Sequence, residues 1–212
     1  SGTRPSLRFF AGDLADELCQ SSDMLEQAYA NGVPMGGNIR GLNESPDFLV
    51  SVQKDPGTQG SAGTDIQRVQ IIKGWVDENG VSREQVFDIA GRKDNGAGIN
   101  PANCERVGQG MTQSCKVWRD PQFKVNEDSF YYVRVLENPS CRWSTLQCQA
   151  AGVNPFAENC ASQAEKATAL AQASGATGDV YSKCCIDPTS AAFYSPTLQE
   201  RAWSSPIWYH SQ

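Results

Sequence analysis

Eight cysteines constrain this chain more than any other feature of its sequence. Their number is even, and they are spread along the chain from Cys19 to Cys185. A structural zinc site needs Cys-x-x-Cys knuckles or paired Cys and His residues, and none of the cysteine spacings here has that form. We therefore expect disulfides, formed in an oxidising compartment such as the periplasm or the extracellular space.

The spacing leaves most of the disulfide pairing open, because eight cysteines can combine in many ways. One local bridge is favoured, between Cys104 and Cys115, since it would close a Gly-rich loop. On the chain-entropy account, such a bridge contributes about 3 kcal/mol to stability. The partners of the remaining cysteines stay undetermined: Cys19, Cys141, Cys148, Cys160, Cys184 and Cys185.

Length and charge exclude several classes of protein. The chain has 212 residues, enough for one large domain or two small ones, with a hydrophobic core of its own. Its net charge is −6, and its basic residues occur at most in pairs such as Arg92-Lys93, so nucleic-acid binding is not expected. No stretch approaches the roughly 18 apolar residues of a membrane span. The oligomeric state is left open.

Local patterns predict a mainly β fold, an antiparallel sheet or a β-sandwich. The predicted strands cover residues 6–10, 47–54, 66–77, 83–90, 116–119 and 130–136. The last is aromatic and β-branched throughout, as is typical of a central strand. Asn79-Gly80 lies between two of these strands and predicts a hairpin with a type I′ turn, which needs positive φ at both central residues.

Two or three helices are expected at the periphery. One is predicted over residues 23–30 and another over residues 163–173, where Ser162 and Glu165 form a capping box and Gly175 ends the helix. Residues 197–203 are interpreted as a final helical turn.

The character of the sequence changes after Glu137. We therefore divide the chain into a β-rich core domain, residues 1–137, and a C-terminal extension, residues 138–212. The extension is cysteine-rich, irregular and helical, and we expect it to pack on the same domain, with disulfides holding its irregular segments.

No complete catalytic site can be assembled from the motifs. Nucleophilic catalysis usually needs a histidine base, and the single histidine, His210, lies near the chain end, where segments commonly fray. The sequence contains no G-x-S-x-G and no H-E-x-x-H motif. We expect no metal site and no cofactor in this chain, and leave open whether it is an enzyme.

Two segments place arginine close to tryptophan, and they carry the candidate contact residues. One interpretation is structural: the arginines stack on the indoles, Trp203 and Trp208 are buried, and the two segments lie together and anchor the chain end. The alternative is a polar-aromatic surface that meets a ligand or a neighbouring domain. The candidate residues are Glu137, Arg142, Trp143, Arg201, Trp203 and His210.

Four segments, which include these two, resemble the C-terminal part of a bacterial family of unknown function. Its members are similar, in their upstream part, to PHP (polymerase and histidinol phosphatase) metal-dependent hydrolases. The resembling segments are GVPMGG (32–37), VQIIKGWVD (69–77), FYYVRVLENPSCRWS (130–144) and QERAWSSPIWY (199–209). The resemblance implies that the metal ligands lie in an upstream barrel domain, and no residue of this chain matches them.

Three functions follow from these observations. The first is a non-catalytic accessory β domain of an exported PHP-like hydrolase, whose partner is the missing N-terminal barrel. The start at Ser1-Gly2 rather than Met agrees with a mature or trimmed piece. The second is an independent extracellular binding or adhesion module released by proteolysis. The third is a stand-alone hydrolase with an unrecognised site.

Overall fold

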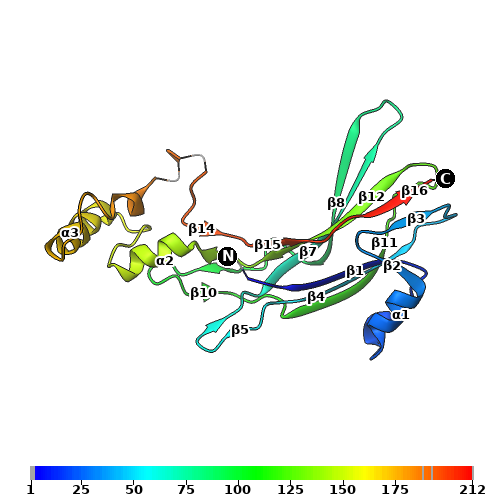
Figure 1. The fold of residues 1–212 in the computed structure, drawn as a ribbon, viewed down its shortest axis with the longest axis horizontal. Coiled ribbons are helices and arrows are strands. Elements are labelled where there is room, and N and C mark those ends of the chain that lie inside the picture. Colours follow the sequence, from blue (N-terminus) through cyan, green and yellow to red (C-terminus); the bar gives the residue numbers. More distant parts are fainter. Residues whose placement is uncertain (1–2, 188, 192, 212) are drawn as a thin grey trace. The chain divides into compact units, whose positions relative to one another are not determined.

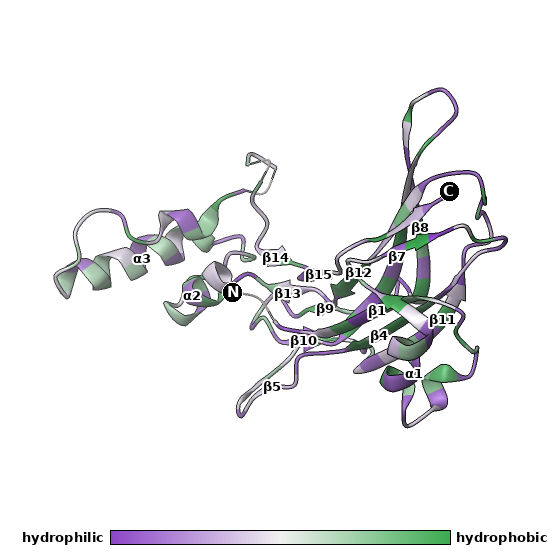
Figure 2. Ribbon diagram, turned by 45° about the vertical axis from the view of Figure 1, so that its right-hand side comes forward, coloured by the Kyte–Doolittle hydropathy of each residue, from purple (hydrophilic) through white to green (hydrophobic). Residues whose placement is uncertain are grey.

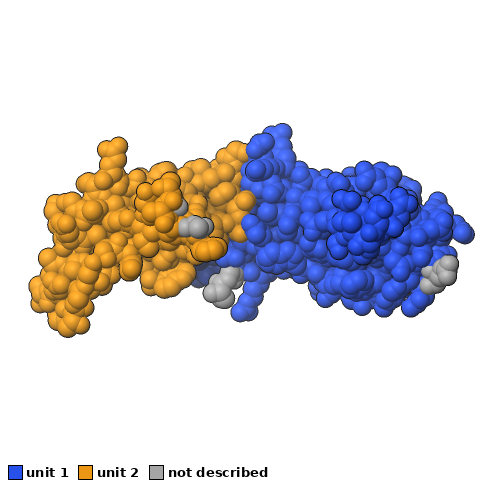
Figure 3. Space-filling model, turned by 90° about the horizontal axis from the view of Figure 1, so that it is seen from above, with its two compact units in different colours: residues 1–95, 109–138, 200–212 blue, residues 96–108, 139–199 orange. Residues whose placement is uncertain are grey.

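The computed structural model describes residues 3–187, 189–191 and 193–211. The chain forms two compact units, which Figure 3 colours separately. Unit 1 comprises residues 1–95, 109–138 and 200–212, and unit 2 comprises residues 96–108 and 139–199. The predicted extension, residues 138–212, therefore contains segments of both units.

Unit 1 contains two large sheets, so the predicted mainly β fold is confirmed. Sheet A has the order β11-β4-β1-β2. Its strands are β1 (Ser6–Gly12), β2 (Gly32–Pro34), β4 (Asp47–Gln53) and β11 (Gln113–Arg119).

Sheet B has the order β3-β16-β12-β7-β8, and β15 also pairs with β12. Its strands are β3 (Asn38–Arg40), β7 (Ile66–Val76), β8 (Ser82–Gly91), β12 (Ser129–Glu137), β15 (Arg201–Trp203) and β16 (Ile207–His210). The pairing is antiparallel except between β16 and β3. A small ribbon, β5 (Gly57–Thr58) with β6 (Ser61–Ala62), lies between β4 and β7 in sequence.

The two sheets pack face to face, as in a β-sandwich. Alternate residues of β1, β4, β7 and β12 point to one shared core, and Figure 2 shows green, hydrophobic segments along this sandwich among purple ones. Contacts between aromatic rings join the sheets: the ring centroids of Phe48 and Tyr131 are 4.5 Å apart, and those of Phe87 and Trp118 are 4.9 Å apart. The predicted central strand, β12, lies between β7 on one side and β15 and β16 on the other.

The other face of sheet A is covered by the segment that follows β1. This segment holds η1 (Leu18–Gln20) and α1 (Met24–Asn31), and Figure 1 shows α1 beside β2. Leu14, Leu18 and Ala28 pack there against the outward side chains of sheet A. Sheet A is therefore buried on both faces.

The hairpin of β7 and β8 turns where the sequence predicted it, but with a different turn. Gly80 has φ +75°, whereas Cys104 is the one non-glycine residue with positive φ among those that the structure describes. Asn79 therefore does not meet the type I′ requirement, and that prediction is wrong. Instead, the Asp77 carboxylate accepts hydrogen bonds from the backbone N–H groups of Asn79 (3.0 Å) and Val81 (2.9 Å), which stabilises a longer loop with Gly80 in the left-handed region.

Unit 2 contains short strands and helices. Its strands are β9 (Gly98–Ile99), β10 (Arg106–Val107), β13 (Ser140–Cys141) and β14 (Thr197–Leu198). Its helices are α2 (Trp143–Ala150), α3 (Cys160–Ala173) and η2 (Ser182–Cys185). The predicted helical turn over residues 197–203 is wrong, because β14 and β15 occupy it and find strand partners far away in sequence. Within the predicted extension, α2 is a helix that the sequence-based predictions did not include.

The predicted second helix is confirmed as α3, but it begins earlier than expected. Asn159 is its N-cap residue, so Ser162 lies inside the helix and the predicted capping box is wrong. The C-terminal prediction is confirmed. Gly175 has φ +98°, and the Ala176 N–H donates to the Ala171 carbonyl, as in a Schellman motif.

Four disulfides use all eight cysteines, so the expected oxidation is confirmed. The pairs are Cys19–Cys115, Cys104–Cys141, Cys148–Cys184 and Cys160–Cys185. The predicted Cys104–Cys115 bridge is wrong. Cys115 lies on the α1 side of sheet A, beside the segment that carries Cys19, whereas Cys104 belongs to unit 2.

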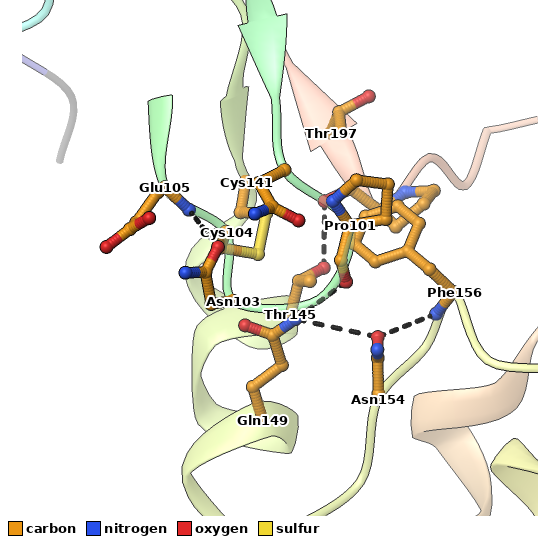
Figure 4. The surroundings of a disulfide bond; sticks show 12 residues. Pro101, Asn103, Cys104, Glu105, Cys141, Thr145, Gln149, Asn154, Phe156 and Thr197 are labelled. Carbon is orange, nitrogen blue, oxygen red and sulfur yellow. Dashed lines mark hydrogen bonds between the residues drawn. A yellow bond between two sulfur atoms is a disulfide. The ribbon is translucent and has the colours of Figure 1, made fainter. Parts of the chain in front are cut away.

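Figure 4 shows the Cys104–Cys141 bridge in unit 2. It connects the loop before β10 to β13, near the start of α2. Hydrogen bonds support the same loop: the Gln149 amide donates to the Pro101 carbonyl at 3.3 Å. The bridge thus lies within a connected local structure.

No helix among the described residues is long and apolar enough to cross a membrane. The four disulfides agree with an oxidising location.

Candidate functional site

The candidate site is the outer face of sheet B, which is the face turned away from the core of unit 1. Strand alternation creates it, because side chains along β12 point in turn to the core and to the outside. Tyr131, Val133 and Val135 are buried in the core. Phe130, Tyr132 and Arg134 point outward and remain partly accessible.

Three aromatic residues of this face form what we call the aromatic ledge: Phe130, Tyr132 and Trp208. The ring centroids of Phe130 and Trp208 are 5.1 Å apart, with the planes tilted by 46°. Phe130 and Tyr132 are stacked at 6.3 Å. Trp208 is 43% exposed, so the ledge presents an aromatic surface to solvent.

Gly74 allows the ledge to lie low on the sheet. It is the neighbour of Phe130 across the β7–β12 pair. A Cβ atom at position 74 would lie 2.3 Å from Cζ of Phe130, which is far inside van der Waals contact. A glycine is therefore needed for the Phe130 ring to cross β7.

A polar row runs across the same face, four residues further along β12. Arg134 donates from Nε to Oε1 of Gln70 at 2.8 Å, and Gln70 donates from Nε2 to Oδ1 of Asp88 at 2.7 Å. The three side chains come from β12, β7 and β8, and the strand register places them opposite one another. Trp203 of β15 is the neighbour of Arg134 on the other side. The face therefore combines aromatic and polar groups in fixed positions.

Beneath the ledge, a buried polar cluster stabilises the inner side of the same strands. Nζ of Lys73 lies 2.9 Å from Oδ2 of Asp120, and the Tyr131 hydroxyl donates to the same oxygen at 2.7 Å. Burial raises the pKa of the Tyr131 hydroxyl, and the hydrogen bond to Asp120 raises it further, so Tyr131 stays protonated as a donor. Since Lys73 adjoins Gly74 and Tyr131 adjoins Phe130, this cluster fixes the backbone that carries the ledge.

A groove of about 560 Å³ lies beside the ledge, at the hairpin end of sheet B. Phe130 and Trp208 supply aromatic surface to its lining. Its charged and titratable lining residues are Arg83, Glu84, Asp128, Tyr209 and His210. Volumes of about 300–1,000 Å³ are typical of small-molecule sites.

The charged groups of the groove are held in place by neighbours. Nε of Arg83 donates to Oδ2 of Asp77 at 2.8 Å. The Ser211 backbone N–H (2.7 Å) and hydroxyl (2.8 Å) both donate to Oδ1 of Asp128. These two hydrogen bonds hold the pKa of the Asp128 carboxyl below its usual value, with a smaller contribution from the charge of His210, so Asp128 is ionised at neutral pH. The groove thus carries two carboxylates and one guanidinium.

A smaller hollow of about 370 Å³ lies elsewhere in unit 1, near Arg92 and Gln109. The Asn95 amide, which also lines it, donates to the Gln109 carbonyl and to the Asn138 side chain, both at 2.9 Å. These bonds connect a loop to its own surroundings and give the hollow a structural role.

Within the described part of the chain, no group of three or more His, Cys, Asp or Glu residues could hold a metal ion.

Comparison with known families gives one match. A protein family described as "protein of unknown function" (DUF3604) matches residues 1–171 of the 212 residues. The chain belongs to this family. No curated protein and no solved structure matches the chain. The DUF3604 match confirms the predicted family of unknown function, whereas the relation to PHP hydrolases stays a prediction.

The candidate residues of unit 1 divide between surface and interior. Trp203 is 57% exposed and Arg201 is exposed, while Ala202 between them packs against the core. The predicted burial of Trp203 and Trp208 is therefore wrong, because their strands turn these residues outward. His210 lines the groove. Glu137 is buried and accepts a hydrogen bond from Thr3.

Arg142 and Trp143 belong to unit 2. Arg142 donates from Nε to the Ser195 carbonyl at 3.0 Å, and Trp143 is 66% exposed at the first residue of α2. The cation–π contacts among the described residues come from Lys73, so stacking of arginine on indole is not observed there. The expected proximity of the two arginine–tryptophan segments stays a prediction.

Sequence reasoning missed most of the groove. Glu84, Asp128 and Phe130 were not singled out. Part of the signal was present, since the alternation in residues 130–136 separates outward from inward side chains. The predicted two-residue turn would have paired Gly74 with Gln85, whereas the observed register pairs it with Glu84.

Proposed function

We propose that this member of the DUF3604 family is a non-catalytic accessory β domain of an exported, PHP-like metal-dependent hydrolase. In this proposal the outer face of sheet B is its binding surface. The observation that carries the proposal is the exposure of Trp203 and Trp208 on a rigid sheet, beside fixed polar groups. Exposed aromatic residues on a structured face are typical of contact surfaces.

The exported parent and its hydrolase activity are supported by different observations. All eight cysteines are paired, as expected of a protein of the periplasm or of a secreted protein. The hydrolase part of the proposal depends on the resemblance of four segments to the C-terminal part of PHP-like proteins. Under this proposal the metal ligands belong to the parent's barrel domain.

An independent extracellular binding module is the second candidate function. The groove beside the ledge favours it, because a domain with its own ligand site can act without a catalytic partner. The two functions use the same face and differ in whether a catalytic domain belongs to the same polypeptide.

The test compares the isolated 23.0 kDa chain with the protein purified from its native source. Mass spectrometry gives the length of each polypeptide, and an assay with added Mn²⁺ or Zn²⁺ measures phosphoester hydrolysis by each. We expect a longer native polypeptide with metal-dependent activity, and no turnover by the isolated chain. A native polypeptide with the same mass as this chain would favour the binding module. Turnover by the isolated chain that a single Asp or Glu substitution abolishes would contradict both.

A further inference from the structure

We propose that the groove beside the aromatic ledge binds a neutral pyranose ring of a glycan. In this site, the apolar face of the sugar packs on Trp208 and Phe130. The inference rests on the proposed use of the outer face as a binding surface, but not on the proposed hydrolase. A failure of glycan binding would therefore leave the mass and activity tests unaffected.

The shape of the ledge selects a flat ligand. The rings of Phe130 and Trp208 pack against each other at 5.1 Å, so they form one continuous surface rather than two opposing walls. A quaternary ammonium ligand would need aromatic faces on several sides. A pyranose instead presents a face of C–H groups, which suits the electron-rich face of an aromatic ring.

The polar groups around the ledge suit hydroxyl groups. Sugar hydroxyls both donate and accept hydrogen bonds, and the groove offers both kinds of partner. Glu84 and Asp128 are exposed carboxylate acceptors, and Arg83 is an exposed donor. Hydrogen bonds to charged groups are the stronger ones. A ligand with adjacent hydroxyls at its edge can use these partners while its face lies on the ledge.

The charge of the groove favours a neutral sugar over an acidic one. Its lining contains the carboxylates of Glu84 and Asp128 against the Arg83 guanidinium and the His210 ring, and the guanidinium already forms an ion pair with Asp77. A uronate or sulfated sugar would bring further negative charge to this surface, which the like charges oppose. The ligand class is therefore a neutral hexose or pentose unit.

The site is organised before a ligand arrives. Gly74 lets Phe130 lie across β7, and Ser211 orients Asp128 through two hydrogen bonds. A preformed site loses less conformational entropy on binding than a flexible one. Weak contacts with a sugar can then add up to measurable affinity.

The test is affinity electrophoresis of the full chain in native gels that contain one soluble polysaccharide each. The neutral probes are mixed-linkage β-glucan, galactomannan, xyloglucan and xylan, and the acidic probes are alginate and polygalacturonate. We expect retardation by at least one neutral probe and by neither acidic probe.

Variants connect the retardation to the groove. Trp208→Ala should weaken it about tenfold or more, as removal of a central aromatic contact does. Glu84→Gln alters an exposed side chain without changing its size and should weaken binding roughly threefold, even if Trp208→Ala proves unstable. Trp143→Ala removes an even more exposed tryptophan from unit 2 and should leave the retardation unchanged.

Three results would overturn the inference, provided that thermal melting shows the chain to be folded. The first is that none of the four neutral probes retards the chain. The second is retardation by the acidic probes alone. The third is retardation by a neutral probe that persists in both Trp208→Ala and Glu84→Gln.

Discussion

In unit 1 the largest buried side chains belong to two facing sheets, whereas the buried cluster of unit 2 consists mainly of cysteines and alanines. Phe9, Phe48 and Tyr131 are almost inaccessible in unit 1. In unit 2 the fully buried Val153 is the one large apolar residue in a cluster with Cys148, Cys160, Cys184, Ala164 and Ala167. Three of the four disulfides lie in unit 2.

This difference indicates how each unit is stabilised. Apolar burial contributes about 25 cal/mol per Å², so the buried core of unit 1 can stabilise its fold. Small domains without such a core need cross-links or metals. Unit 1 therefore provides the rigid sheet that a binding site requires, and unit 2 depends on its disulfides.

Reduction of the disulfides should have the largest effect. Each bridge removed typically costs 2–5 kcal/mol, and unit 2 would lose all three of its disulfides at once. We expect the amides of α3 to exchange freely with deuterium after reduction, while those of β7 and β12 stay protected. Exchange measured by mass spectrometry, with thiol titration as the control, checks this. Continued protection of α3 in fully reduced protein would contradict the account of unit 2.

Deletion of a core ring in unit 1 should have the second-largest effect on stability. Phe48→Ala removes a side chain that contacts the rings of Phe9, Trp118 and Tyr131, so it should destabilise unit 1 by about 3–5 kcal/mol. Denaturant unfolding followed by tryptophan fluorescence measures the change. Phe193→Ala is the matched control, since Phe193 is 99% exposed and should change stability by less than about 0.5 kcal/mol. Equal effects of the two substitutions would refute the core assignment.

A turn substitution should have an intermediate effect. Gly80→Val places a β-branched residue at φ +75° and should cost about 1–3 kcal/mol through backbone strain alone, because the space around Gly80 is open. Gly80→Asn should cost less, since asparagine tolerates the left-handed region. Thermal melting of the two variants distinguishes them, and an unchanged midpoint for Gly80→Val would show that the turn lies elsewhere.

The smallest effect is expected at Trp203. The sequence argument placed this residue in the interior, where its deletion would cost about 3–5 kcal/mol. Because Trp203 is 57% exposed, we now expect Trp203→Ala to destabilise unit 1 by less than about 1 kcal/mol. A loss above 3 kcal/mol would show that the indole is buried after all.

The sequence was informative wherever the signal is local. Alternation and β-branched content predicted β4, β7, β8 and β12, and Asn79-Gly80 placed the hairpin. Gly175 marked the end of α3. In each case the residues that carry the signal also form the structure.

Features that depend on distant residues could not be predicted. The partner of Cys115 is 96 positions away, so loop length gave the wrong answer. Whether Trp203 points inward depends on its pairing with Arg134, which no local pattern reveals. The groove has the same origin, since Glu84, Phe130 and His210 come together only after the four strands β16, β12, β7 and β8 have paired.

The most direct test of the binding surface is an NMR titration of the five tryptophan indole N–H signals, assigned by single substitution. The probe is a mixture of neutral cello- and manno-oligosaccharides. The account predicts that the Trp208 signal shifts most and that the Trp143 signal of unit 2 does not move. A shift of Trp143 without a shift of Trp208 would contradict the claim that the ligand site lies on the outer face of sheet B.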